Sequence, residues 1–303
     1  MHRRIAWLVA IGALLHGAQA CAQPSPPQRP PESFMEAGER AMSWTRRFVR
    51  LGPRPAGSAA LAAQRGLIAS GLAGLSCDVE VDSFVAPTPV GALGMANVFA
   101  RFGPPDADGV VVVSGHYDTA RIPGFVGAND GGSSAGLLMA LAERIHLARP
   151  GPVWLAFFDG EESTVEWRDN DHTYGSRRAA AAWAADGTAE RIRALINVDM
   201  IGDADLRLLY EGNSTARLRE ALWAVAADLG YEAVFSRRIG YIEDDHIPFL
   251  RAGVPSLNLI DFDYGPRNAY WHTAEDSLDK LHPRSFATVL HVLEVGIRRL
   301  LED

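Results

Sequence analysis

Residues 110–118 read VVVVSGHYD, a run of four valines that leads into a histidine and an aspartate. A short apolar run rich in β-branched residues is typical of a strand buried on both faces of a parallel sheet. Similar runs follow at 153–158 and 192–198, and helices are predicted over 133–148 and from residue 174 onward. This alternation predicts a largely parallel sheet with helices on both faces.

The rest of the chain fits one domain built around that sheet. Apolar residues recur at steps of three and four over 34–48, which predicts a helix, and a second helix is expected over 58–72. Further strands are expected near 79–81, 97–101, 206–210 and 254–260, and an amphipathic helix over 286–300 closes the chain. The prediction is a single α/β domain over residues 34–303, with a mixed, mostly parallel central sheet.

The N-terminal segment has a different composition from this domain. A basic start, an apolar run over 5–15 and the small-residue pattern Ala18-Gln19-Ala20 are typical of an export signal. The apolar run is well short of the roughly twenty residues that a membrane-spanning helix needs. Five prolines within 22–32 favour extended, unpacked backbone. We therefore expect a signal peptide at 1–20, a linker at 21–33 and a periplasmic or secreted protein, with lipid attachment at Cys21 as the alternative.

Charge and cysteine content exclude several classes of function. The formal net charge of -8, from 37 acidic and 29 basic residues, argues against a nucleic-acid partner. Cys21 and Cys77 are the only cysteines of the sequence, which excludes a cysteine-rich zinc site and a disulfide scaffold. Any metal must be held by histidines and carboxylates. A monomer without a transmembrane span is expected.

Acidic residues and histidines follow each predicted buried strand. In open α/β sheets, ligands bind beyond the carboxyl ends of the strands, so such side chains are predicted to meet at one edge. Others lie ahead of the helix at 133–148 and in two later segments. The candidates are His116, Asp130, Glu161, Glu162, Asp199, Asp244 and His272.

Taken singly, these residues have ordinary explanations. An aspartate before a helix, such as Asp130, is usually an N-cap worth about 1 kcal/mol. Together, however, so many carboxylates and imidazoles at one edge would repel and desolvate one another without a cation. Oxygen and imidazole ligands without thiolate suit a catalytic Zn²⁺. Because the adjacent Glu161 and Glu162 cannot easily both bind one ion, one is expected to bind the metal and the other to transfer protons.

The same segments resemble the zinc aminopeptidase superfamily over essentially all of residues 34–303. The matching strings are HYD at 116, GANDGG at 127, FFDGEES at 157, NVDMIG at 197 and WHT at 271. Further features are similar to the glutaminyl cyclase branch of that superfamily: Trp167 soon after the paired glutamates, the string YGSR from Tyr174, the string DDHIPFLRAGVP from Asp244, and Trp271 directly before His272.

The resemblance implies a role for each candidate. The implied ligands of one zinc ion are Asp130, Glu162 and His272, with Glu161 as the acid-base. Asp199 and Asp244 would support proton transfer and orient the substrate. Trp167 and Trp271 would line a pocket for the N-terminal glutamine of a peptide or protein, with packing as the alternative role of Trp167. The implied reaction converts that glutamine to pyroglutamate and releases ammonia.

A two-zinc aminopeptidase is the alternative. In the double-zinc aminopeptidases, the residues that match His116 and Asp199 hold a second metal, and the residue that matches Asp130 bridges the two metals. The cyclases also resemble this chain at these positions, but they hold one zinc. The segment GANDGGSSAG is closer to the peptidase version, and the cysteine pair of animal cyclases is missing. A non-catalytic binding protein would be expected to lose some of these positions, and all are intact. Phe262, Tyr264 and Tyr270 are the candidates for an aromatic that closes the pocket.

Overall fold

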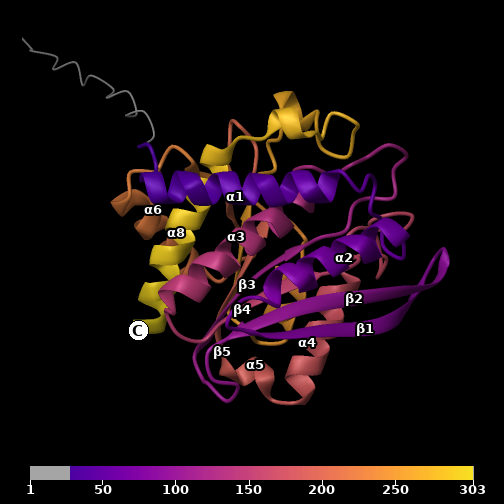
Figure 1. The fold of residues 1–303 in the computed structure, drawn as a ribbon, viewed down its shortest axis with the longest axis horizontal. Coiled ribbons are helices and arrows are strands. Elements are labelled where there is room, and N and C mark those ends of the chain that lie inside the picture. Colours follow the sequence, from indigo (N-terminus) through magenta and orange to yellow (C-terminus); the bar gives the residue numbers. More distant parts are fainter. Residues whose placement is uncertain (1–27, 303) are drawn as a thin grey trace, which may run out of the picture.

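The computed structural model describes residues 28–302, which Figure 1 shows as a ribbon. The predicted signal peptide and the first part of the predicted linker, to residue 27, lie outside the described residues. Helix α1 (Glu32–Val49) begins two residues before the expected start of the domain at residue 34. The carbonyl of Pro31 accepts hydrogen bonds from the backbone N–H groups of Phe34 and Met35, which fixes this start. The Gln28 N–H donates to the Gly230 carbonyl at 3.3 Å, so the described end of this segment contacts the domain.

Within residues 28–302 the strands form a six-stranded sheet and a separate two-stranded sheet. The order of the larger sheet is β1-β2-β4-β3-β5-β8. Its first two pairings are antiparallel, and those of β4, β3, β5 and β8 are parallel. The strands of this sheet are β1 (Asp78–Thr88), β2 (Gly91–Phe102), β3 (Val110–His116), β4 (Val153–Phe158), β5 (Ile192–Asp199) and β8 (Ser256–Ile260). The small sheet pairs β6 (Leu208–Glu211) with β7 (Phe235–Gly240) in parallel.

Helices cover both faces of the larger sheet. Figure 1 shows α1, α3 and α8 on one side and α4 and α5 on the other. The larger core cluster joins the sheet to the first group, and Phe249 and Trp183 contribute to a smaller cluster on the opposite face. The remaining helices are α2 (Ala59–Leu72), α3 (Gly132–Ala148), α4 (Tyr174–Ala185), α5 (Thr188–Arg191), α6 (Ala216–Asp228), α7 (His246–Arg251) and α8 (Pro283–Glu302), with short 3₁₀ turns at Pro266–Asn268 and Leu278–Lys280.

The valine run occupies the centre of the larger sheet. Val110 to Val113 are fully buried because β3 pairs with β4 on one side and β5 on the other, with helices above and below. Burial of each such side chain contributes about 1.5–3 kcal/mol. Parallel pairing brings the carboxyl ends of these strands to one edge, where His116 pairs with Phe158 and Asp199 with Ile260.

The predicted fold class is confirmed: a single α/β domain with a mixed central sheet between helices. Two regions extend beyond the prediction. The strands expected near 79–81 and 97–101 form one long antiparallel hairpin, and α6, β7 and α7 were not predicted. Among residues 28–302, no helix combines the length and hydropathy required for a membrane span.

Candidate active site

The candidate residues meet at the carboxyl edge of the larger sheet. His116 is the last residue of β3 and Asp199 the last of β5, while Glu161 and Glu162 follow β4 after a short turn. Asp130 lies just before α3, and His272 lies in the loop after β8. Gly131, between Asp130 and α3, adopts φ +74°, and a Cβ there would lie 2.2 Å from the carbonyl oxygen of Asp118. The tight turn that presents Asp130 therefore requires glycine.

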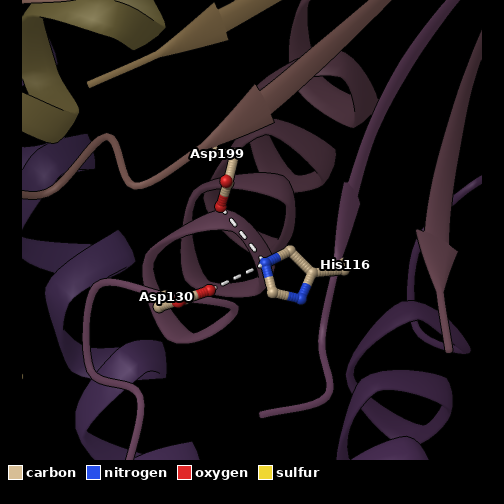
Figure 2. A group of neighbouring side chains, drawn as sticks. All are labelled: His116, Asp130 and Asp199. Carbon is tan, nitrogen blue, oxygen red and sulfur yellow. Dashed lines mark hydrogen bonds and ion pairs between the residues drawn. The ribbon is translucent and has the colours of Figure 1, made fainter. Parts of the chain in front are cut away.

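One group of potential ligands consists of His116, Asp130 and Asp199, which Figure 2 shows pointing toward one another. The Nε2 atom of His116 lies 3.2 Å from Oδ1 of Asp130 and 3.2 Å from Oδ1 of Asp199. All three side chains are buried.

A second group consists of Asp130, Glu162 and His272. The Nε2 atom of His272 lies 3.2 Å from Oδ2 of Asp130 and 3.1 Å from Oε1 of Glu162. Asp130 belongs to both groups, with one carboxylate oxygen facing each. His272 has φ +53°, a left-handed conformation that costs on the order of 1 kcal/mol for a non-glycine residue and is typical of functional sites.

Negative charge dominates the electrostatics of both groups. Burial raises the pKa of Glu162 to about 7 and that of Asp199 to about 6. Burial disfavours the imidazolium of His272, but its hydrogen bonds to Asp130 and Glu162 raise its pKa to about 10. Carboxyl groups and imidazoles therefore hold protons that a divalent cation would displace. Imidazole nitrogens and carboxylate oxygens in groups of three are a donor set that suits Zn²⁺.

Glu161 lies beside both groups and belongs to neither. Its Oε2 atom is 3.9 Å from Nδ1 of His116, and burial, with the charges of Glu162 and Asp244, raises its pKa well above the usual value. The carboxylate of Asp118 accepts hydrogen bonds from the backbone N–H groups of Glu161 at 3.1 Å and Glu162 at 3.2 Å. One buried acid thus holds the backbone of both adjacent glutamates.

Asp244 is fixed by two side-chain amides at the same edge. Its Oδ1 accepts a hydrogen bond from Nδ2 of Asn197 at 3.0 Å, and its Oδ2 accepts one from Nδ2 of Asn258 at 2.7 Å. Asn197 lies on β5 and Asn258 on β8, so the sheet itself orients this carboxylate toward the pocket.

A cavity of about 530 Å³ opens above these residues. Trp167 and Trp271 both line it and are 37% and 36% exposed. The Trp271 ring stacks on His272 with centroids 4.0 Å apart, and the Trp167 ring stacks on His172 at 4.3 Å. The full lining is Asp130, Glu161, Glu162, Ser163, Val165, Glu166, Trp167, Asp199, Tyr241, Ile242, Glu243, Asp244, Ile260, Phe262, Trp271 and His272.

The cavity distinguishes the three aromatic candidates of the loop after β8. Phe262 lines the cavity and packs against Trp271, with centroids 5.0 Å apart. Tyr264 is fully buried and donates its hydroxyl hydrogen bond to Asp276, while Tyr270 packs edge-on against Tyr264. Phe262 is therefore the member of this set that contacts the cavity.

Sequence reasoning missed two buried acids that fix loops around the cavity. Asp171 accepts hydrogen bonds from the backbone N–H groups of residues 164–166, which hold the loop that leads to Trp167. Asp276 accepts hydrogen bonds from the backbone N–H groups of Asn129 and Asp130. Asp171 follows Trp167, and Asp276 follows His272, by a few positions. Exposed acids in turns occur at the same spacing, so this spacing alone does not identify a buried acid.

Comparison with known proteins relates the chain to one family. The profile of Peptidase family M28 matches residues 97–295. The glutaminyl-peptide cyclotransferase of Drosophila melanogaster is 32% identical over 254 residues, which cover 74% of this chain and 71% of that protein. The Bos taurus protein of the same name is 30% identical over 260 residues, with coverage of 74% and 71%. The structure of an Acidobacteriales bacterium glutaminyl cyclase superposes with a TM-score of 0.83 at 36% identity, covering 94% of this chain and 99% of that one.

Proposed function

The chain belongs to peptidase family M28, and we propose that it is a glutaminyl-peptide cyclotransferase, which converts the N-terminal glutamine of a peptide to pyroglutamate and releases ammonia. The observation that carries this proposal is the position of Glu161: it lines the same cavity as Asp130, Glu162 and His272 but belongs to neither group of potential ligands. A carboxylate placed in this way remains available for proton transfer. The similarity to glutaminyl-peptide cyclotransferases supports the choice of reaction.

In the proposed enzyme, Asp130, Glu162 and His272 hold one Zn²⁺. Their donor atoms lie within 4.8 Å of one another, and a site with three protein ligands leaves a coordination position open. When bound, the ion supplies Lewis-acid polarisation of the γ-carboxamide carbonyl.

Glu161 moves the protons of the proposed reaction. The α-amine nitrogen attacks the carbonyl carbon of the γ-carboxamide (Cδ) of the same glutamine, so a ring C–N bond forms while the bond from that carbon to the amide nitrogen breaks. Glu161 accepts the proton that the amine loses and donates a proton to the departing ammonia, which regenerates the carboxylate. Burial is the first cause of its raised pKa, and a carboxyl group with a raised pKa can donate a proton as well as accept one.

The cavity walls orient the substrate. In this proposal Asp199 and Asp244, which both line the cavity, accept hydrogen bonds from the α-amine. The amides of Asn197 and Asn258 hold Asp244. Trp167 and Trp271 exclude water, which the cyclisation does not consume, and hold the side chain folded back on its amine.

A zinc aminopeptidase that uses two zinc ions to hydrolyse N-terminal residues remains the second candidate. The observation that favours it is the complete group of His116, Asp130 and Asp199, which shares Asp130 with the first group. A second ion there would activate water between two metals. In the cyclase, His116 and Asp199 instead remain hydrogen-bonded to each other.

We extend the proposal to the cellular context. Residues 1–20 direct export and are removed, residues 21–33 link the cleavage site to the catalytic domain at 34–303, and the enzyme acts as a monomer in the periplasm or outside the cell. Lipid attachment at Cys21 is the alternative to a free form. The partners are peptide and protein N-termini rather than nucleic acid, in line with the net charge of -8.

The decisive experiment compares two substrates on one zinc-quantified sample. Ammonia release from Gln-Phe-Ala is measured beside leucine release from Leu-Phe-Ala. Ammonia release with about one zinc per chain supports the cyclase. Leucine release with about two overturns it in favour of the aminopeptidase.

A further inference from the structure

Asp276 joins two loops of the site through its carboxylate. Its Oδ1 accepts hydrogen bonds from the backbone N–H of Asn129 at 2.7 Å and from the Tyr264 hydroxyl at 2.8 Å. Its Oδ2 accepts a hydrogen bond from the backbone N–H of Asp130 at 3.1 Å. The Ala128 N–H donates to the Asp276 carbonyl at 3.4 Å, so side chain and backbone both hold this segment.

The two connected loops carry different parts of the site. Residues 128–130 present Asp130, whereas the loop from Phe262 to His272 forms one cavity wall and contains Tyr264. Asp276 and Tyr264 are both fully buried, so neither hydrogen bond competes with bulk solvent. The position of the Asp130 backbone therefore depends on a side chain that contacts neither the cavity nor the potential ligand atoms of Glu162 and His272.

We propose that Asp276 is a positioning residue that sets the Asp130 carboxylate for zinc binding and couples its position to the wall formed by the loop after β8. This inference rests on the proposed role of Asp130 as a zinc ligand. Residues that orient metal ligands in this way typically change metal affinity about 10- to 100-fold when substituted.

The substitution Asp276→Asn tests the hydrogen bonds of Asp276 without changing the size of the side chain. The asparagine keeps the size of the side chain but replaces one acceptor oxygen with an NH₂ group, which then faces a backbone N–H donor. Asp261 provides a matched control because it is also buried and accepts two backbone hydrogen bonds, from Arg207 at 2.8 Å and Asp263 at 3.0 Å. Asp261 makes no hydrogen bond to Asp130. Asp261→Asn therefore introduces the same chemical change without removing a hydrogen bond to the Asp130 backbone.

Zinc affinity of the purified proteins, measured by competition with a chromophoric chelator, tests the proposal. We expect Asp276→Asn to weaken zinc binding about 10- to 100-fold and Asp261→Asn to change it by less than about twofold. Tyr264→Phe, which removes one donor to Asp276, is expected to weaken zinc binding less than Asp276→Asn does, and it keeps the test decisive if Asp276→Asn fails to fold.

Each outcome of these measurements supports or overturns the positioning role of Asp276. Wild-type affinity in both Asp276→Asn and Tyr264→Phe overturns the positioning role and leaves the proposed function standing. If Asp276→Asn fails to fold, wild-type affinity in Tyr264→Phe alone overturns that role. An equal loss in Asp276→Asn and Asp261→Asn also overturns it, because any buried aspartate would then have the same effect. Failure of the wild-type protein to bind zinc overturns this inference and the proposed function together.

Discussion

The Nε2 atom of His272 lies 3.2 Å from Oδ2 of Asp130, although β4, β5 and β8 all intervene between these residues in the chain. The other oxygen of Asp130 faces His116 at the same distance. One carboxylate therefore contacts two histidines, one at the end of β3 and the other in the loop after β8. A change at either histidine is expected to alter the charge that Asp130 presents to the other.

Replacing His272 is expected to remove the metal. His272→Ala deletes one of three proposed ligands, so zinc content after dialysis should fall well below one per chain and ammonia release should fall more than about 100-fold. Metal analysis and an ammonia assay on the same sample check this. His282→Ala, at an exposed histidine outside the cavity, serves as the control and should retain both. Full zinc content in His272→Ala would contradict the ligand assignment.

The adjacent glutamates provide a matched pair of variants. Glu161→Gln removes the titrating group but no proposed ligand, so turnover should fall about 10²- to 10⁴-fold while zinc stays bound. Glu162→Gln should lose zinc and turnover together. Parallel measurement of kcat and zinc content distinguishes the two. Full turnover in Glu161→Gln would assign the proton transfer to another group.

The buried Asp261 predicts a pH dependence of stability. Burial raises its pKa to about 7, whereas the pKa of an aspartate in an unfolded chain is about 3.9. Between these values the folded protein binds a proton that the unfolded chain has lost, so this group's contribution to stability decreases as pH rises. The free energy of unfolding of the wild type, relative to Asp261→Asn, should fall from pH 4.5 to 7.5 and level off above about pH 8. Urea titrations in the presence of a chelator measure it, and a constant difference would contradict the expectation.

Trp167 tests the pocket against the packing alternative. If the indole contacts substrate, Trp167→Ala should raise KM for Gln-Phe-Ala about tenfold, since an aromatic contact contributes about 0.5–1.5 kcal/mol beyond its buried area. Zinc content and melting temperature should stay close to wild type, because the side chain is 37% exposed. A lower melting temperature with unchanged KM would support the packing role.

The sequence was sufficient to predict the layers of the fold and the edge where the site lies. The valine run of β3 and the apolar run of β4 are buried on both faces, so their strands have a strong local pattern, and the polar residues that follow them lie at the same edge. The hairpin of β1 and β2 was predicted too short because much of it is exposed and lacks a continuous apolar run. Leu218, Leu222 and Val225 do recur at helical spacing in α6, a pattern that could have identified that helix.

The connections within the site could not be predicted. Asp276 acts on the backbone N–H groups of Asn129 and Asp130, and no property of the local sequence indicates which distant N–H an acid will meet. Tyr264 and Phe262 are likewise close in sequence, yet one is buried against Asp276 and the other lines the cavity. Tertiary packing of the loop after β8 decides between them.

The order of strands in the larger sheet also has a consequence for biosynthesis. His116 and Asp199 end β3 and β5, and Glu162 follows β4, so all three are synthesised before β8 and the His272 loop. A nascent chain that has already paired β3, β4 and β5 still has an uncovered edge at β5 and lacks one of the three donors. If Asp130, Glu162 and His272 hold an ion together, as proposed, the site is complete only after translation has passed residue 272. Metal binding would then follow the folding of the sheet and would not guide its first steps.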